Sequence, residues 1–283
     1  MNLRQVRTKT KSITNVRKIT KAMQLVSAIK MKKAQQLAVD GKPYHDALEY
    51  LIRNVSKGID ISSSQLLTAK EKKHKTLVLY ISSNKGLCGS FHTSLNRFVL
   101  RNIEYQNHDW ITVGKKAGMV MSRLGGKVIA DFSTTRALFE VSAIFDLILK
   151  EFFAGSYNEV FILYNKFISS MKFETVYEKI LPIHVNVKKD SHVNVNFNYI
   201  IEPDPTTLVD TLLRNYLEEK IREAIISSEA VEHSARMMAM KTATDNATDV
   251  IYSLTLLGNK LRQTKITSEL IDMVTAKESV EAG

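Results

Sequence analysis

Hydrophobic residues recur at alternating steps of four and three along the last part of the chain. Between Thr206 and Ala282 the sequence has no proline and a single glycine, Gly258, and Asp204-Pro205 supplies a helix start just before it. The recurring apolar positions are Ala243, Ala247, Val250, Leu254, Leu257 and Leu261. Such a heptad pattern keeps one apolar stripe against a partner helix. If most of this stretch is one helix, it is roughly 100 Å long.

The first 42 residues supply the predicted partner helix. They contain no proline, and their only glycine is Gly41. Apolar residues step by three, four and three at Val16, Ile19, Met23 and Val26. We therefore expect an antiparallel coiled coil of residues 1–57 and 206–283 that carries a globular insert. A helical bundle in which both ends fold back onto the middle fits the same pattern.

The middle of the chain has a different period. Short apolar runs of the kind found in buried strands alternate with helical segments after Phe91 and over Val141–Phe153. The predicted strands are Leu77–Ile81, Trp110–Val113, Val128–Ala130, Glu159–Phe167 and Thr175–Ile183. Glycines at 114, 118, 125 and 126 are interpreted as turns. This alternation predicts an α/β domain over residues 75–200 with a mostly parallel sheet.

Charge adds a preference for an acidic or polyanionic partner. The 283-residue chain has a net charge of +11, and residues 1–39 contain ten Lys or Arg and no Asp or Glu. Nucleic acid, an anionic membrane face, an acidic protein surface and a simply solvated basic helix all remain open. The first aromatic residue is Tyr44, which disfavours base stacking. There is no apolar run long enough to span a membrane and no secretory signal pattern.

Candidate catalytic chemistry is weak. The loop with Gly86 and Gly89 follows a predicted strand, but Lys85 precedes the glycines, so the loop matches neither phosphate-binding glycine motif. Cys88 and His92 make a pair without a third group, and a small buried residue is the favoured role of the cysteine. The seven histidines do not show metal-ligand spacing. We expect no enzyme acting alone, no cofactor and no metal.

Three stretches together carry a family resemblance. The first is ITKAMQLVSA from Ile19, the second is NKGLCGSF from Asn84, and the third is MKTATDNA from Met240, which continues through residues 259–269. In this order and spacing the chain resembles the γ subunit of the F1 sector of F-type ATP synthase over its whole length.

The resemblance implies both an architecture and a set of partners. It implies an antiparallel coiled coil of the terminal helices beside a Rossmann-like α/β domain. The coil would fill the axis of a ring of three α and three β subunits, and its rotation would change nucleotide affinity on β, where catalysis occurs. The foot would bind ε and the c-ring, which implies a peripheral protein on the cytoplasmic face of the cell membrane and no nucleic acid.

The resemblance also implies contact residues for the ring. Met23 would lie at the height of the β lever, and plain coiled-coil packing is the alternative for it. The other implied contacts are Lys241, Asn259, Lys260, Arg262, Gln263, Thr267 and Glu269. Two departures stand out: Ala276-Lys277 replaces a Gly-Ala pair, and Gly258 stands where an aromatic residue is common.

Two other functions stay open at this point. One is the shaft of a specialised F1-like motor that is not coupled to proton flow. The other, from a different class, is a basic coiled-coil protein that binds nucleic acid through its N-terminal helix.

Overall fold

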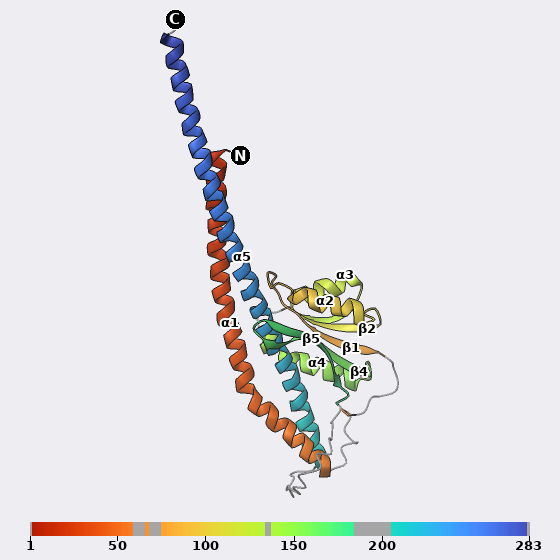
Figure 1. The fold of residues 1–283 in the computed structure, drawn as a ribbon. Coiled ribbons are helices and arrows are strands. Elements are labelled where there is room, and N and C mark those ends of the chain that lie inside the picture. Colours follow the sequence, from red (N-terminus) through yellow and green to blue (C-terminus); the bar gives the residue numbers. More distant parts are fainter. Residues whose placement is uncertain (1, 59–65, 68–74, 134–136, 184–204, 282–283) are drawn as a thin grey trace. The chain divides into compact units, whose positions relative to one another are not determined.

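The computed structural model describes residues 2–58, 66–67, 75–133, 137–183 and 205–281 (Figure 1). The chain forms two compact units. Unit 1 combines the two chain ends, residues 1–27 and 236–283, and unit 2 comprises residues 28–235. Residues 184–200 of the predicted α/β domain lie outside the described part.

Two long helices contribute to both units. Helix α1 spans Leu3–Gly58 and helix α5 spans Pro205–Glu281, which confirms the predicted terminal helices. The Gly41-Lys42-Pro43 sequence allows a break, but α1 continues through Pro43. Proline removes one backbone hydrogen bond without ending a helix whose neighbouring turns are held by packing. Leu48 and Ile52, which follow Pro43, are buried in the core of unit 2.

Unit 2 contains the predicted sheet. Its strands are β1 (Thr76–Ile81), β2 (His108–Val113), β3 (Lys127–Phe132), β4 (Glu159–Ser169) and β5 (Lys172–Leu181). They are arranged in the order β3-β2-β1-β4-β5. The β3-β2, β2-β1 and β1-β4 pairs are parallel and only β4-β5 is antiparallel, as expected for an α/β domain.

One helix of unit 2 was missed by the sequence prediction. Besides α2 (Phe91–Asn102), η2 (Ala137–Glu140) and α4 (Val141–Phe153), the structure has α3 at Lys115–Leu124. The glycines interpreted as turns are largely the ends of this helix. Gly114, with φ of 92°, precedes its first residue, and Gly125 ends it in the left-handed conformation.

Each face of the sheet carries its own core. Successive residues of β1 point to opposite faces, so that Leu77 and Leu79 belong to one core and Val78 and Tyr80 to the other. Helices α1, α4 and α5 contribute to the first core, and α2, α3 and Val231 of α5 to the second. The α/β domain is therefore a sheet with helices on both faces (Figure 1).

Candidate functional site

The ends of α1 and α5 pack against each other as an antiparallel pair in unit 1. The side-chain oxygens of Thr20 and Thr244 lie 2.8 Å apart. Fourteen residues towards the N-terminus, Val6 is in contact distance of Gly258, because a Cβ placed on this glycine would lie 3.5 Å from its Cγ1 atom. Since Val6 precedes Thr20 by the same number of residues as Gly258 follows Thr244, the register is constant.

The stripe of α1 that faces α5 is not the predicted one. Val16, Ile19 and Val26 are 49%, 59% and 53% exposed, and Met23 is half-buried. The buried positions of α1 in unit 1 are Val6, Thr20 and Ser27, with Ile13 half-buried between them. The prediction was wrong because it ranked positions by hydrophobicity, whereas the packed stripe includes hydroxyl side chains.

The prediction for α5 was closer. Ala247 and Leu254 are buried, and Ala243 and Leu261 are half-buried. Val250 and Leu257 are 43% and 38% exposed, and the half-buried neighbours Ile251 and Gly258 take their place. The packed positions are seven residues apart on both helices, at 6, 13, 20 and 27 on α1 and at 240, 247, 254 and 261 on α5. Ile19 and Val26 have the same spacing, so the spacing alone does not identify the packed stripe.

Unit 1 consequently displays an unusual amount of apolar surface. The exposed side chains on α1 are Val16, Ile19, Leu25 and Val26. Those on α5 are Val250, Tyr252, Leu256, Leu257, Ile266, Leu270, Ile271, Met273 and Val274. Apolar surface gathered on two helices in this way marks a site of association with other proteins.

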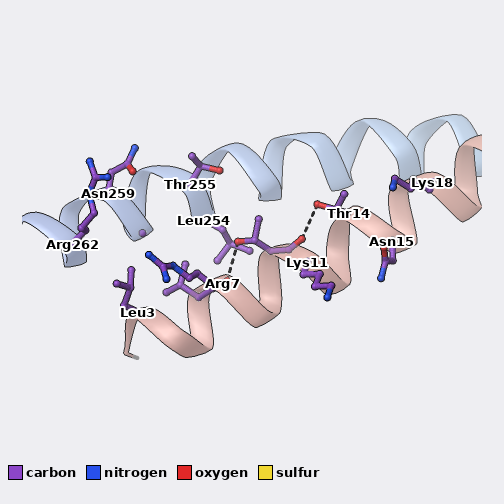
Figure 2. A pocket seen from close by; sticks show the side chains of 13 residues that line it. Leu3, Arg7, Lys11, Thr14, Asn15, Lys18, Leu254, Thr255, Asn259 and Arg262 are labelled. Carbon is purple, nitrogen blue, oxygen red and sulfur yellow. Dashed lines mark hydrogen bonds between the residues drawn. The ribbon is translucent and has the colours of Figure 1, made fainter.

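A groove of about 550 Å³ runs between the two helices (Figure 2). Its lining includes Gly258, and its cations are Arg7, Lys11 and Lys18 from α1 and Arg262 from α5. None of its thirteen lining residues is acidic. We call it the basic groove. Its charge suits an acidic partner, since opposite charges brought together in a partly enclosed site attract more strongly than in open water.

Two of the predicted contact residues line the basic groove. Asn259 and Arg262 project from α5 near the start of α1, marked by Leu3 in Figure 2. Three others, Lys260, Gln263 and Thr267, share a second shallow surface on α5 with Ile271. The Thr267 hydroxyl donates to the carbonyl of Gln263 at 3.0 Å.

The remaining predicted contacts are separate from these two surfaces. Glu269 is paired with Lys265 at 3.4 Å and both are exposed. Lys241 is exposed, and Met23 is the half-buried residue already described. The sequence prediction missed Arg7, Lys11 and Lys18, which the 3.6-residue period of α1 places on the face that borders α5.

The loop that contains Gly86 and Gly89 is held in place by contacts within unit 2. Cys88 is 1% exposed, as its predicted role required. The His92 ring lies 3.1 Å from the hydroxyl of Ser82 and 3.2 Å from that of Ser83, so its contacts hold the loop against the end of β1. No group of three or more metal-binding side chains occurs among the described residues.

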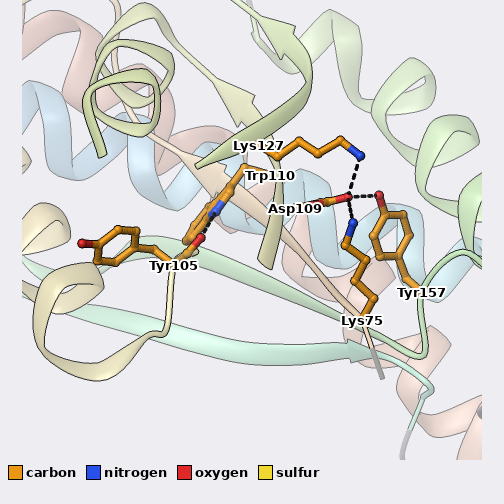
Figure 3. A network of polar contacts seen from close by, with 6 residues as sticks. All are labelled: Lys75, Tyr105, Asp109, Trp110, Lys127 and Tyr157. Carbon is orange, nitrogen blue, oxygen red and sulfur yellow. Dashed lines mark hydrogen bonds and ion pairs between the residues drawn. The ribbon is translucent and has the colours of Figure 1, made fainter. Parts of the chain in front are cut away.

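A buried carboxylate joins the amino ends of the parallel strands (Figure 3). Asp109 Oδ2 lies 2.8 Å from Lys75 Nζ and 3.4 Å from Lys127 Nζ, and accepts a hydrogen bond of 2.7 Å from Tyr157. Burial alone would raise the pKa of Asp109, but the hydrogen bonds from Lys75 and Tyr157 and the charges of both lysines outweigh it and lower this pKa. Each partner lies at the start of a strand or within two residues before it, which indicates a structural role.

The exposed apolar residues and the basic groove of unit 1 are typical of a protein that binds other proteins through a pair of helices. None of the long described helices has the length and hydropathy to cross a membrane. Comparison with known proteins gives the class of this docking protein. A model of the ATP synthase family matches residues 2–280.

Curated relatives match over nearly their full length. The ATP synthase gamma chain of Akkermansia muciniphila is 36% identical, with 99% of each chain covered. That of Polaromonas is 36% identical over 98% of this chain and 99% of its own, and that of Clostridium perfringens is 34% identical over 98% of each. The chain belongs to the ATP synthase gamma-chain family, a family of non-catalytic stalk subunits. This confirms the resemblance and supports it over both alternative functions.

Solved structures share the fold. The rotor of the Euglena gracilis mitochondrial ATP synthase in rotational state 1 has a TM-score of 0.65 and 20% identity, and covers 93% of this chain and 98% of its own. A chain of the OSCP/F1/c-ring structure from the same organism, in rotational state 3, has a TM-score of 0.67 and 17% identity, with 99% and 95% covered. At these identities the likeness establishes the fold alone.

Proposed function

We propose that the chain is the rotating shaft of an F1 sector. In this proposal unit 1 occupies the axis of a ring of three α and three β subunits. Rotation presents a different face of the shaft to each β subunit, which changes the nucleotide affinity there and couples catalysis to ion flow. The shaft biases the β subunits through contacts that differ between their conformations.

The outward apolar surface of unit 1 is the observation that carries the proposal. Val16, Ile19 and Val26 remain 49%, 59% and 53% exposed although they are the most regular apolar stripe of α1. Full burial of such a side chain stabilises a complex by about 1.5–3 kcal/mol. A chain that leaves these residues uncovered while packing Thr20 and Ser27 inside is built to be covered by other subunits.

The free end of α5 supports the same arrangement. In the register of the pair, Leu3 is level with Leu261, because each lies three residues beyond the Val6–Gly258 contact. The rest of α5 extends past the start of α1, and Ile266, Leu270 and Met273 are 49%, 54% and 62% exposed. We propose that an apolar sleeve of the ring surrounds this single helix.

The basic groove is the proposed contact for acidic segments of β. In the groove, Arg262 and Asn259 would bind acidic side chains of β. Further polar contacts along α5 would come from Lys260, Gln263, Thr267 and Glu269. Lys241 and Met23 would contact the ring elsewhere along the helical pair. Charged hydrogen bonds to carboxylates are about twice as strong as neutral ones, so such contacts suit a load-bearing interface.

The remaining parts of the proposal concern the foot of the shaft. Residues 1–57 and 206–283 would act as the shaft, and 75–200 as the α/β domain that binds ε and the c-ring. The chain would then be a peripheral protein at the cytoplasmic face of the cell membrane and would not bind nucleic acid.

Co-expression with the α and β subunits of the same organism tests the proposal. The tagged chain should purify as one copy in an α3β3 ring with ATPase activity. Removing the residues after Leu261 should impair hydrolysis while the α/β domain stays folded. A chain that purifies without any ring and with nucleic acid attached contradicts the proposal.

A charge reversal locates the working contact. Arg262→Glu should lower the ATPase rate of the assembled ring about tenfold or more, since it places like charges at a desolvated contact. Lys172→Glu, an equal change at the exposed first residue of β5 in unit 2, is the matched control and should leave the rate unchanged. An equal change in ATPase rate for both variants would show that the basic groove is not a contact for β.

A further inference from the structure

The second helical layer of unit 2 has a cationic outer face. Helices α2 and α3 cover the same face of the sheet and bury Phe91, Leu95, Ala117 and Met121 against it (Figure 1). Nine residues of the two helices are exposed, and none is acidic. They include the cations Arg97, Arg101, Lys115 and Arg123 and the apolar residues Leu100 and Met119. We call these six residues the cationic face.

The charges of this face are not neutralised within the described chain. Some cations elsewhere in unit 2 are paired, as Lys179 is with Glu159 and Arg222 with Glu218 and Glu219. The described residues provide no ion pair for any of the four cations of the cationic face. Of the carboxylates beside the two helices, Asp131 accepts hydrogen bonds from Thr112 and Ser133, and Glu104 accepts one from Asn107. Four positive charges on one face therefore favour the binding of an anionic partner.

The size and composition of the face decide what kind of partner fits. A stable protein interface involves about 20–30 residues a side and concentrates aromatic residues. The nine exposed residues of α2 and α3 include no aromatic side chain. Anionic lipid headgroups need only a few cations, each contributing on the order of 1 kcal/mol, with one or two apolar side chains at the boundary of the acyl chains.

We propose that the cationic face binds anionic phospholipid headgroups. Arg97, Arg101, Lys115 and Arg123 hold the phosphates, while Leu100 and Met119, 55% and 51% exposed, enter the interfacial region. The binding is electrostatic in origin, so it weakens as salt shortens the range of the attraction. This function is separate from the ring contacts of unit 1 and does not depend on them.

A fluorescent probe on the face itself tests the proposal in the full-length chain. Met119→Cys is labelled with an environment-sensitive dye, since the native Cys88 is buried and unreactive. Vesicles of phosphatidylcholine with about one-third phosphatidylglycerol should raise and blue-shift the emission, and pure phosphatidylcholine vesicles should not. Met171→Cys, at a methionine 84% exposed on the β4–β5 turn, is the matched control and should not respond.

Three results would overturn the proposal. One is a silent probe at Met119 while the chain still co-sediments with the vesicles, because the basic α1 helix would then bind the lipid. Another is an equal response at Met171. The third is a response to polyaspartate but not to vesicles, which would assign the cationic face to an acidic protein.

A charge-removal pair measures the contribution of the cations. Arg97→Gln with Arg123→Gln should weaken partitioning to the anionic vesicles about thirtyfold, the loss expected for two interfacial charges. Lys166→Gln with Lys172→Gln removes the same charge from the β4–β5 hairpin and should weaken it by less than about twofold. Circular dichroism of both variants verifies that they fold. Equal losses in the two pairs would contradict a site on α2 and α3.

Discussion

The hydroxyl oxygens of Thr20 and Thr244 meet at 2.8 Å across the two-helix unit, inside the packed stripe. The Thr244 hydroxyl also lies 2.7 Å from the carbonyl oxygen of Met240, and the Thr20 hydroxyl 3.0 Å from that of Arg17. Each hydroxyl has one proton, so one threonine donates across the pair while the other donates to its own helix. A part-buried polar pair of this kind specifies which residues face each other.

Replacing both threonines should loosen the register without unfolding the helices. Thr20→Val with Thr244→Val keeps the side-chain shapes and changes stability by less than about 1 kcal/mol, because both polar groups disappear together. The register is measured by disulfide formation between Val6→Cys and Gly258→Cys. A disulfide between Ile13→Cys and Gly258→Cys reports a register shifted by seven residues. In the double-valine variant the yield of this disulfide should rise, and the yield of the Val6→Cys–Gly258→Cys disulfide should fall. An unchanged ratio would show that the threonines do not set the register.

Gly258 should be replaceable by alanine with a gain in stability. Its new Cβ atom would make an ordinary contact with Val6 at 3.5 Å. Alanine in a helix interior is about 1 kcal/mol more favourable than glycine. Amide hydrogen exchange in α5 around residue 258 should therefore slow about fivefold. Faster exchange in Gly258→Ala would mean that the glycine is required for packing on α1.

A charge on the exposed stripe of α1 should affect ring assembly, whereas a charge on the packed stripe should affect the stability of the helical pair. Val16→Asp, on the exposed stripe, should change the stability of the isolated chain by less than about 0.5 kcal/mol but prevent ring assembly. Val6→Asp, at a residue 2% exposed, should destabilise the helical pair by about 2 kcal/mol. Urea unfolding and co-purification with α and β separate the effects. Assembly of Val16→Asp at the wild-type level would contradict the docking role of the stripe.

Asp109 should make the stability of unit 2 depend on acid. Its pKa is lower in the folded chain than the value of about 3.9 expected when unfolded. The stabilisation is therefore fully present above about pH 5 and is lost as the pH falls through the folded pKa. Asp109→Asn should cost about 2 kcal/mol near neutral pH, since it removes a charged hydrogen-bond acceptor.

The pH profile distinguishes this role from simple packing. Urea midpoints of wild type and Asp109→Asn, measured from about pH 7 down to about pH 3, should converge as the wild-type carboxyl becomes protonated. A constant difference between the two proteins over this range would show that the carboxylate charge is unimportant.

The sequence predicted the elements better than their faces. The parallel strands and the two terminal helices follow from period and length, which depend only on neighbouring residues. Helix α3 was missed because Gly114 and Gly125, which lie just outside its ends, resemble turn residues when the contacts of Ala117 and Met121 with the sheet are unknown.

The candidate site was harder to predict for a physical reason. Val16 and Ile19 are more hydrophobic than Thr20, so a hydrophobicity pattern assigns them to the intramolecular stripe. They are exposed because a surface meant for other subunits is as apolar as a core. The seven-residue spacing does not separate the two stripes either, because Ile19 and Val26 share it with Ile13 and Thr20.

The antiparallel pairing of the chain ends also has a consequence for biosynthesis. Gly258, the residue that Val6 contacts, is translated about 250 residues after Val6. At about 5–20 residues per second this delay is roughly ten seconds to a minute. During that interval α/β strands can pair while the basic, apolar start of α1 stays uncovered. The nascent chain thus offers its first docking stripe to chaperones or newly made ring subunits well before its own last helix leaves the ribosome.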